Sequence, residues 1–222
     1  MDDYQAFIDR RDAGRVLASR LAPYASRDDV VVLALPRGGV PVAYEIASAL
    51  GVPMDVFLVR KLGTPGHREL AMGAIASGGV RVLNEDVVHW YGISDFAIER
   101  IAREEQEELQ RRERAYRGDR PTPDLTNKIV ILVDDGLATG STMRAAAQAV
   151  RARRPARVVI AVPVGAPQTC ADLAAVADEM ICARMPEPFS AVGQWYLNFE
   201  QTGDDEVREL LQKSSAIPEA HH

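Results

Sequence analysis

Short apolar runs recur along the chain, and their spacing predicts a parallel β-sheet with helices between its strands. The clearest runs are residues 30–35 and 129–133, in which every residue is apolar. A strand that is covered on both faces shows this pattern, because neither face meets water. We expect further strands at 54–59, 157–162 and 178–183.

Between these runs, apolar residues recur every three or four positions, which places them on one face of a helix. Helices are expected at 3–22, 40–50, 95–117, 141–152 and 167–176. Gly51 and Ser94 fit a C-cap and an N-cap of two of them. The alternation predicts an α/β fold with a doubly wound, mostly parallel sheet flanked by helices. Such folds bind ligands at the carboxyl ends of the strands.

Two segments differ from this alternation. The segment 61–80 carries glycines and a proline, and we expect a long loop with a short strand or hairpin near 80–83. In the helix at 95–117, Glu and Arg alternate and few apolar residues are available for packing. We interpret this helix as having a solvated face, or as an arm that faces a second subunit.

The run at 129–133 leads into the most informative segment of the chain. Two adjacent carboxylates, Asp134 and Asp135, follow it directly, and three hydroxyl side chains lie within 139–142 at the start of the next helix. A helix N-terminus binds anions through unpaired N–H groups and its dipole. Carboxylates would repel a phosphate alone, so the ligand should offer hydroxyls or a metal ion as well. The segment is neither a Walker A loop nor a dinucleotide fingerprint, and a plain capped turn needs only one hydroxyl.

Residues 133–142 read Val-Asp-Asp-x-x-x-Thr-Gly-x-Thr. This pattern resembles the loop of type I phosphoribosyltransferases that binds 5-phosphoribosyl 1-diphosphate (PRPP). The resemblance implies that Asp134 and Asp135 hold the ribose hydroxyls. It implies that the loop after them binds the rest of the ribose phosphate, through Gly136, Ala138, Thr139, Gly140, Ser141 and Thr142.

Two further loops end neighbouring strands. Arg37, Gly38 and Gly39 follow the first strand, where glycines let a ligand approach the backbone and an arginine suits an anion. On the resemblance, these three residues bind the diphosphate of PRPP. Arg60 and Lys61 end the second strand and match the start of a mobile catalytic loop, where they would neutralise the departing pyrophosphate. A solvated strand end is the alternative.

The likeness extends over nearly the whole chain to a bacterial group of predicted phosphoribosyltransferases, some of them fused to hydrolase domains. It rests on Phe7-x-Asp-Arg-x-Asp-Ala-Gly near the start and on Val59-Arg-Lys-Leu-Gly-x-Pro-Gly further along. The segment 62–75 is interpreted as a lid, because its glycines and proline offer hinges and the reaction must exclude water. His67 is a candidate for proton transfer, with a surface histidine as the alternative, and Glu69 is a candidate for orienting substrate or metal.

The acceptor site of type I enzymes lies under a variable hood. In the tail of this chain, Phe189, Trp195 and Tyr196 are candidates for stacking on a planar base. The alternative is that these aromatic side chains pack the tail onto the sheet. No lysine of the tail is placed to read a purine 6-oxo group, which disfavours a hypoxanthine-type acceptor.

Composition narrows the class of protein. The 222 residues, 47% hydrophobic and 26% charged, fit one globular domain. We treat 1–222 as a single phosphoribosyltransferase domain, with a core at 28–183 and a hood from 1–25 and 184–212. A net charge of −6 disfavours nucleic-acid binding. There is no signal-peptide pattern and no apolar stretch that would span a membrane, and both cysteines are expected to be reduced, so we expect a cytoplasmic protein.

The resemblance implies transfer of the phosphoribosyl group from PRPP to a nitrogenous acceptor, with pyrophosphate released and Mg²⁺ bridging the diphosphate and the ribose. A homodimer is compatible with the sequence, and the acceptor stays open. A PRPP-sensing regulator of the same fold is the alternative, for which Arg111, Arg112 and Arg114 would form a basic face. A PRPP synthetase is disfavoured, because that enzyme needs two tandem domains.

Overall fold

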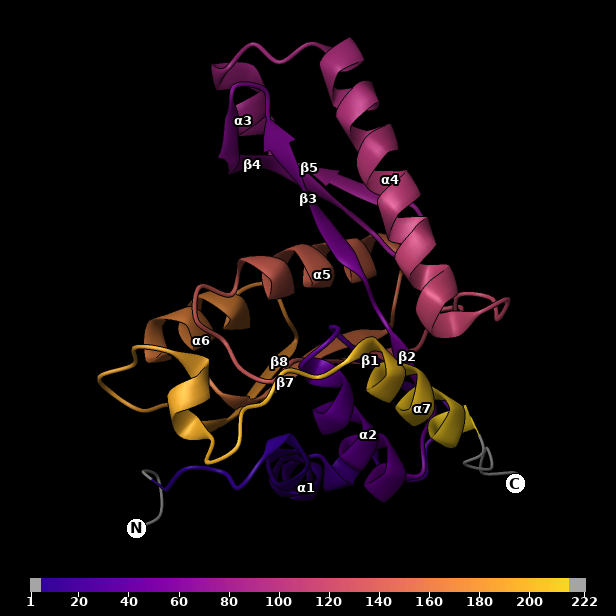
Figure 1. Ribbon diagram of the computed structural model, residues 1–222, viewed down its shortest axis with the longest axis vertical. Helices are drawn as coiled ribbons and strands as arrows, with labels where there is room; N and C mark the ends of the chain where they lie inside the picture. Colours follow the sequence, from indigo (N-terminus) through magenta and orange to yellow (C-terminus); the bar gives the residue numbers. More distant parts are fainter. Residues whose placement is uncertain (1–4, 216–222) are drawn as a thin grey trace.

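A five-stranded sheet forms the centre of the molecule, in the order β2-β1-β6-β7-β8 (Figure 1). The structure, a computed structural model, describes residues 5–215 apart from the side chains of Arg68 and Glu69. The strands of this sheet are β1 (Val30–Ala34), β2 (Met54–Val56), β6 (Ile129–Val133), β7 (Arg157–Val164) and β8 (Glu179–Arg184). All neighbouring strands are parallel. The predicted doubly wound α/β fold is therefore confirmed.

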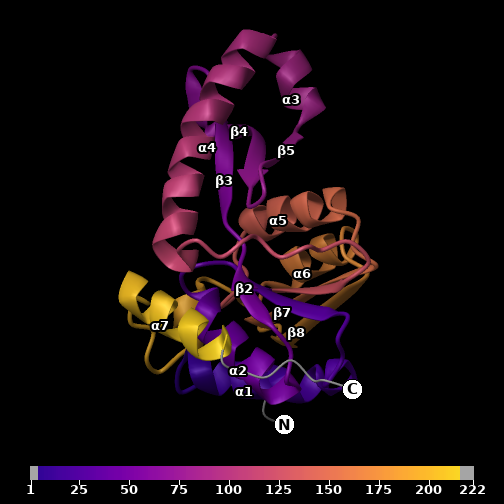
Figure 2. The ribbon, with the colours of Figure 1, turned by 90° about the vertical axis from the view of Figure 1, so that its right-hand side faces the viewer.

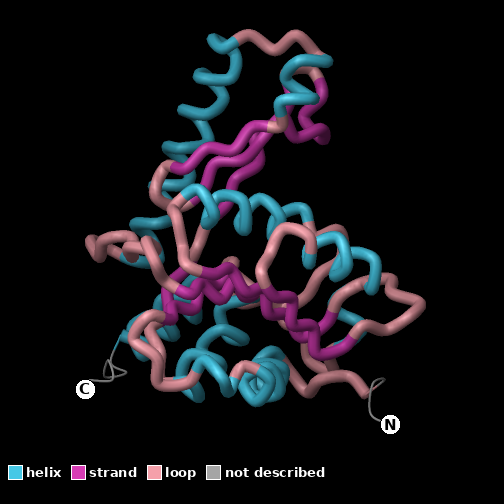
Figure 3. The backbone as a smooth tube through the Cα atoms, turned by 180° about the vertical axis from the view of Figure 1, so that it is seen from behind, coloured by secondary structure: helices cyan, strands magenta, loops and turns pink. Residues whose placement is uncertain are grey.

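Helices cover both faces of the sheet (Figures 1 and 3). They are α1 (Arg10–Arg20) and α2 (Gly39–Leu50) on one face, and α5 (Ser141–Ala152) and α6 (Pro167–Ala174) on the other. Alternate side chains of β1 enter different cores: Val32 packs with α1 and α2, whereas Val31 packs with α5 and α6. Every residue of β1 and β6 is buried, which explains why these strands contain no polar residue.

The register of the two central strands positions the site. Ala34 of β1 lies opposite Val133 of β6. Because both strands end at the same level, the segments that follow them meet at one edge of the sheet.

The first helix is shorter than expected. α1 begins at Arg10, after the N-cap Asp9, whose side chain accepts a hydrogen bond of 2.8 Å from an N–H of the first turn. Before it, Phe7 forms a β-bridge with Tyr196. The prediction of a helix from residue 3 was therefore wrong for residues 5–9. The bridge brings the two predicted hood segments together, although the division into core and hood stays a prediction.

Residues 59–83 form a three-stranded antiparallel sheet that projects from the core (Figures 1 and 2). Its strands are β3 (Val59–Thr64), β4 (His67–Ala76) and β5 (Val80–Leu83). Pro65 and Gly66 form the turn between the first two, with Gly66 at φ +78°, as a type II turn requires. The prediction of a loop over 61–80 was wrong, because these residues mark a tight turn and not a long loop. The strand expected at 54–59 is likewise divided between β2 and β3.

The long helix α4 (Asp95–Arg117) packs along this projecting sheet (Figure 2). Ser94 caps it as expected, accepting a hydrogen bond of 3.3 Å from the N–H of Ala97. The inner face of α4 buries Ile98, Leu109 and Tyr116. Its outer face is solvated, as predicted, but the helix is also part of the packing of its own chain.

Two further helices were not predicted, α3 (Glu85–Trp90) and α7 (Asp204–Ser215). The signal for α7 is the spacing of Val207, Leu210 and Leu211, which are buried where α7 packs against α2 and α4. Short 3₁₀ turns lie at Ala22–Tyr24 and Val192–Trp195. Within residues 5–215, no helix is both long and apolar enough to cross a membrane.

Candidate active site

The two carboxylates that follow β6 lie at the edge of the sheet and contact one another. The N–H of Asp135 donates a hydrogen bond of 2.8 Å to Oδ1 of Asp134. Burial, followed by the charge of Asp135, raises the pKa of Asp134 well above its ordinary value. Acids held in such an arrangement destabilise the fold locally, which is typical of a functional site.

Arg10, at the start of α1, holds the second acid in place. Its Nε and a terminal nitrogen each lie 2.8 Å from Oδ2 of Asp135. Burial raises the pKa of Asp135, and the charge of Arg10 opposes that shift. The guanidinium group also lies 3.9 Å from the centroid of the Phe199 ring and donates to the carbonyl of Glu200 at 2.6 Å. The sequence did not predict this role, although Arg10 stands in the motif that begins at Phe7.

The segment after the acids leads into the N-terminus of α5. Gly140 is its N-cap, with φ +69°, and no side chain of the described residues caps the first turn. The N–H groups of that turn have no intrahelical partner and are suited to an anion. The hydroxyls of Thr139 and Ser141 lie 3.4 Å apart. From α6, Thr169 fastens the loop by donating to the carbonyl of Ala138 at 2.7 Å.

Close packing requires glycine at three positions of the site. A Cβ atom on Gly38 would lie 2.0 Å from Oδ2 of Asp135, and one on Gly39 would lie 2.7 Å from the carbonyl oxygen of Val133. A Cβ atom on Gly136 would lie 2.5 Å from a valine methyl of the tail. The sequence attributed the first two glycines to the approach of a ligand. In the structure they also allow the loop after β1 to pack against the acid pair.

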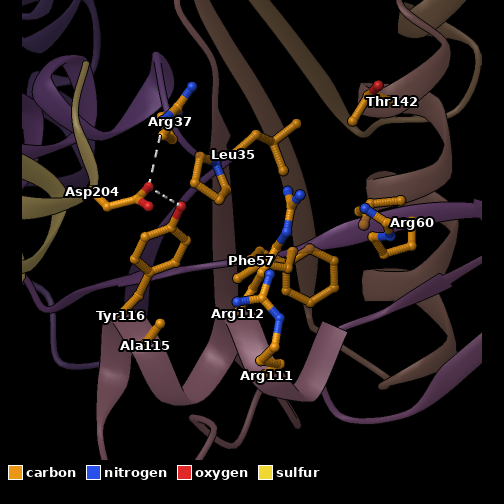
Figure 4. A pocket seen from close by; sticks show the side chains of 13 residues that line it. Leu35, Arg37, Phe57, Arg60, Arg111, Arg112, Ala115, Tyr116, Thr142 and Asp204 are labelled. Carbon is orange, nitrogen blue, oxygen red and sulfur yellow. Dashed lines mark hydrogen bonds and ion pairs between the residues drawn. The ribbon is translucent and has the colours of Figure 1, made fainter. Parts of the chain in front are cut away.

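Arg37 forms an ion pair with the start of α7 (Figure 4). One terminal nitrogen lies 3.6 Å from Oδ1 of Asp204, which also accepts a hydrogen bond of 2.7 Å from the hydroxyl of Tyr116. Burial, and then this hydrogen bond, raise the pKa of Tyr116 to about 12, so the hydroxyl remains a donor at neutral pH. Asp204 and Tyr116 were not predicted as site residues, since the sequence places them far from Arg37.

The structure separates Arg60 from Lys61. Successive side chains of a strand point to opposite faces. Arg60 lies on the α4 side of β3, where it pairs with Glu105 at 2.6 Å. Lys61 lines a different cavity, which it shares with Thr139 and Ser141. The two cations that were expected to act together therefore face different parts of the site.

A cavity of about 300 Å³ lies between the loops and α4 (Figure 4). It is bounded by the carboxyl ends of β1 and β2, the start of α5 and the last turns of α4. Its charged and hydroxyl-bearing lining residues are Arg37, Arg60, Arg111, Arg112, Tyr116, Thr142 and Asp204. Four arginines around one cavity suit an anion such as a phosphate.

Comparison with known proteins decides the family. The sequence model of the phosphoribosyl transferase domain family matches residues 8–199. The chain belongs to this family. A protein of Mycobacterium tuberculosis (strain H37Rv) named "Putative phosphoribosyl transferase Rv0571c" is 50% identical over 208 residues, which are 94% of this chain and 47% of that protein. The chain thus spans about half the length of the curated relatives it matches.

A solved structure shares the fold of this chain. The crystal structure of TT1426 from Thermus thermophilus is 43% identical to this chain, with a TM-score of 0.84, over 94% of this chain and 99% of that one. The resemblance to type I phosphoribosyltransferases that the sequence indicated is confirmed.

The lid candidates of the sequence lie on the projecting sheet. His67 is the first residue of β4 and follows the turn between β3 and β4. Its ring lies 5.4 Å from that of Tyr91 and is exposed. The structure does not bring His67 to the acid pair, which favours the surface alternative. The side chain of Glu69 lies outside the described part of the chain, so its role stays a prediction.

The aromatic side chains of the tail pack inward. Tyr196 is buried, donates its hydroxyl to the carbonyl of Asp135 at 2.6 Å, and stacks on Phe199 with ring centroids 4.9 Å apart. Trp195 and Phe189 are half-buried against the main core. For all three predicted acceptor residues, the structure favours the packing alternative.

Tyr196→Phe should lower the free energy of unfolding by about 1–2 kcal/mol, because the part-buried carbonyl of Asp135 loses its hydrogen-bond donor. Urea unfolding of the variant measures this change. Tyr91→Phe is a matched control, since Tyr91 is 45% exposed. An unchanged unfolding midpoint for Tyr196→Phe would contradict the structural role of this hydroxyl.

Asp134 and Asp135 are the residues best placed to hold a cation. Among the described residues, no group of three or more His, Cys, Asp and Glu side chains is arranged to bind a metal ion. Two carboxylates nevertheless fit Mg²⁺, which takes oxygen ligands and completes its shell with waters and substrate phosphates. A cation would also offset the burial and the repulsion by Asp135 that raise the pKa of Asp134.

Proposed function

We propose that the protein transfers the 5-phosphoribosyl group from PRPP to a nitrogenous acceptor such as a nucleobase, with release of pyrophosphate. The observation that carries this proposal is the contact between the acid pair and the Gly38 loop, beside the N-terminus of α5. PRPP has ribose hydroxyls between a 5′-phosphate and a 1-diphosphate. These three groups match hydrogen-bond acceptors, a helix N-terminus and an arginine-bearing loop.

The acid pair is assigned to the ribose. Arg10 occupies Oδ2 of Asp135, and a backbone N–H occupies Oδ1 of Asp134. A carboxylate has about four acceptor sites on its two oxygens, so each acid can also accept a hydrogen bond from a ribose hydroxyl. In the same site Mg²⁺, held by these carboxylates and the substrate, would neutralise charge on the diphosphate.

The phosphates of PRPP are assigned to separate elements. The N-terminus of α5 and the hydroxyls around Gly140 bind the 5′-phosphate, and Lys61 approaches it from the cavity it shares with those hydroxyls. Arg37, Gly38 and Gly39 bind the diphosphate, with Arg60 across the cavity. This proposed division differs from the expectation that Arg60 and Lys61 act on the same phosphate group.

The reaction breaks the bond between C1 of the ribose and the diphosphate oxygen, and forms a bond from C1 to the acceptor nitrogen. Positive charge develops on the ribose, and negative charge develops on the leaving diphosphate. The protein contributes by orienting the substrate and by placing fixed cations near the leaving group. No covalent intermediate with the protein is needed.

Pyrophosphate release tests this proposal. The protein is incubated with PRPP and Mg²⁺ together with purines, pyrimidines or non-nucleobase amines, one at a time. We expect release with one acceptor class and none without an acceptor. PRPP binding without turnover on any acceptor would favour a PRPP-sensing regulator, and failure to bind PRPP would contradict both functions.

We also propose that this reaction serves nucleotide metabolism in the cytoplasm. Both cysteines, Cys170 and Cys182, are buried free thiols, which is common for proteins of a reducing compartment. Activity with a nucleobase acceptor in the release assay would support the metabolic assignment.

A further inference from the structure

We infer that Arg111 and Arg112 of α4 bind the diphosphate that leaves PRPP. On this inference, an ordered helix of the same chain supplies positive charge opposite the Arg37 loop. It rests on the proposed function and adds two residues that lie outside the motifs of the substrate loops.

α4 passes beside the cavity. Arg111 and Arg112 lie in its last turns and line the cavity at the carboxyl ends of β1 and β2 (Figure 4). Arg37 and Arg60 line the same cavity. The side chains of Arg111 and Arg112 are 69% and 47% exposed, so an anion can reach them without disturbing the core.

The arginines of the cavity differ in how far carboxylates neutralise them. Arg111 and Arg112 both bond to a single carboxylate, Glu108, at 2.8 Å. The hydrogen bonds from both arginines lower the pKa of Glu108 to about 2. Glu108 is therefore ionised at neutral pH and offsets only one of the two arginines. Arg37 pairs with Asp204, and Arg60 pairs with Glu105, so the four arginines of the cavity are matched by three paired carboxylates. The excess positive charge of the cavity therefore lies on α4.

The opposite wall is also suited to phosphate. α2 begins at Gly39, directly after the Arg37 loop, and α5 begins at Ser141, beside Thr142 of the cavity lining. A helix N-terminus carries partial positive charge and unpaired N–H groups. Arginine binds phosphate through two parallel N–H donors. A group with two linked phosphates can contact this wall and the α4 arginines together.

Calorimetric binding of inorganic pyrophosphate with Mg²⁺ tests the inference on the whole chain. We expect the double variant R111A/R112A to weaken binding about tenfold or more, because each arginine removed takes away charge-assisted hydrogen bonds. Glu108→Gln should tighten pyrophosphate binding, since it frees both guanidinium groups. If Glu108, Arg111 and Arg112 only stabilise the helix, this variant should bind pyrophosphate no more tightly than the wild type. R111K/R112K keeps the charges without the paired donors, and it should lose less than the alanine variant.

Arg114→Ala is the matched control, because Arg114 is exposed on the same helix and does not line the cavity. Equal pyrophosphate affinity of the wild type and R111A/R112A, or an equal loss in Arg114→Ala, would overturn the inference. Ribose 5-phosphate is the second probe, and its binding should be the same in all variants. If the wild type binds pyrophosphate but not ribose 5-phosphate, the proposed function fails, while the binding of pyrophosphate by Arg111 and Arg112 stands.

Discussion

Gly38→Ala is expected to lower PRPP-dependent turnover by about 100-fold or more. The reason is that the added methyl group displaces substrate-binding groups that must be closely aligned. A Cβ atom at this position would lie 2.0 Å from Oδ2 of Asp135. The glycine loop and the acid would therefore have to move apart. The backbone at Gly38 has φ −61° and ψ −33°, which alanine adopts without strain. The effect is thus steric, and steady-state kinetics with the acceptor found in the release assay measures it.

Gly203→Ala is the matched control, because no heavy atom lies within 4 Å of its Cβ position. This variant should turn over like the wild type. Thermal unfolding of both variants shows whether any loss of activity comes from unfolding. Full activity in Gly38→Ala would mean that the glycine loop and the acid pair do not meet as described.

Asp134→Asn should lower turnover by about 100-fold and at the same time stabilise the fold. The asparagine oxygen can still accept the hydrogen bond from the N–H of Asp135. Its side chain carries no charge, so the burial and repulsion that raise the pKa of Asp134 no longer act on the folded state. The midpoint of thermal unfolding should rise by about 2–4 °C for each kcal/mol gained in a domain of this size.

The gain in stability of Asp134→Asn should depend on pH in a defined direction. Since the pKa of Asp134 is raised on folding, the folded protein keeps a proton that the unfolded chain releases above about pH 3.9. The wild type therefore loses stability as the pH rises through that window, up to the raised pKa. Asp134→Asn lacks this loss, so its advantage should be larger at pH 8 than at pH 5. A variant that is less stable than the wild type at pH 8 would contradict this account of Asp134.

The central sheet and the donor loops could be predicted because their signals are local. β1 and β6 are buried on both faces, so every residue of each strand is apolar. Asp134, Asp135 and the glycines after β1 follow strand ends directly, and parallel neighbours bring strand ends to one edge.

The remaining features depend on contacts between segments that are distant in the sequence. Arg10 reaches Asp135 across 125 positions, and no spacing rule marks such a pair. α4 reaches the cavity because it packs along the antiparallel sheet, so that its last turns lie beside the core. The aromatic tail was ambiguous for a similar reason, since stacking on a ligand and packing on the chain need the same residue types.

A calorimetric titration of PRPP with Mg²⁺ into the wild type and Asp135→Asn tests the central claim most directly. Asparagine keeps the size of the side chain and an oxygen that can accept from Arg10, so the substitution mainly removes the charge. We predict saturable binding by the wild type and binding at least about tenfold weaker by the variant. Identical titrations of the two proteins, or no binding by the wild type, would contradict the assignment of this loop to PRPP.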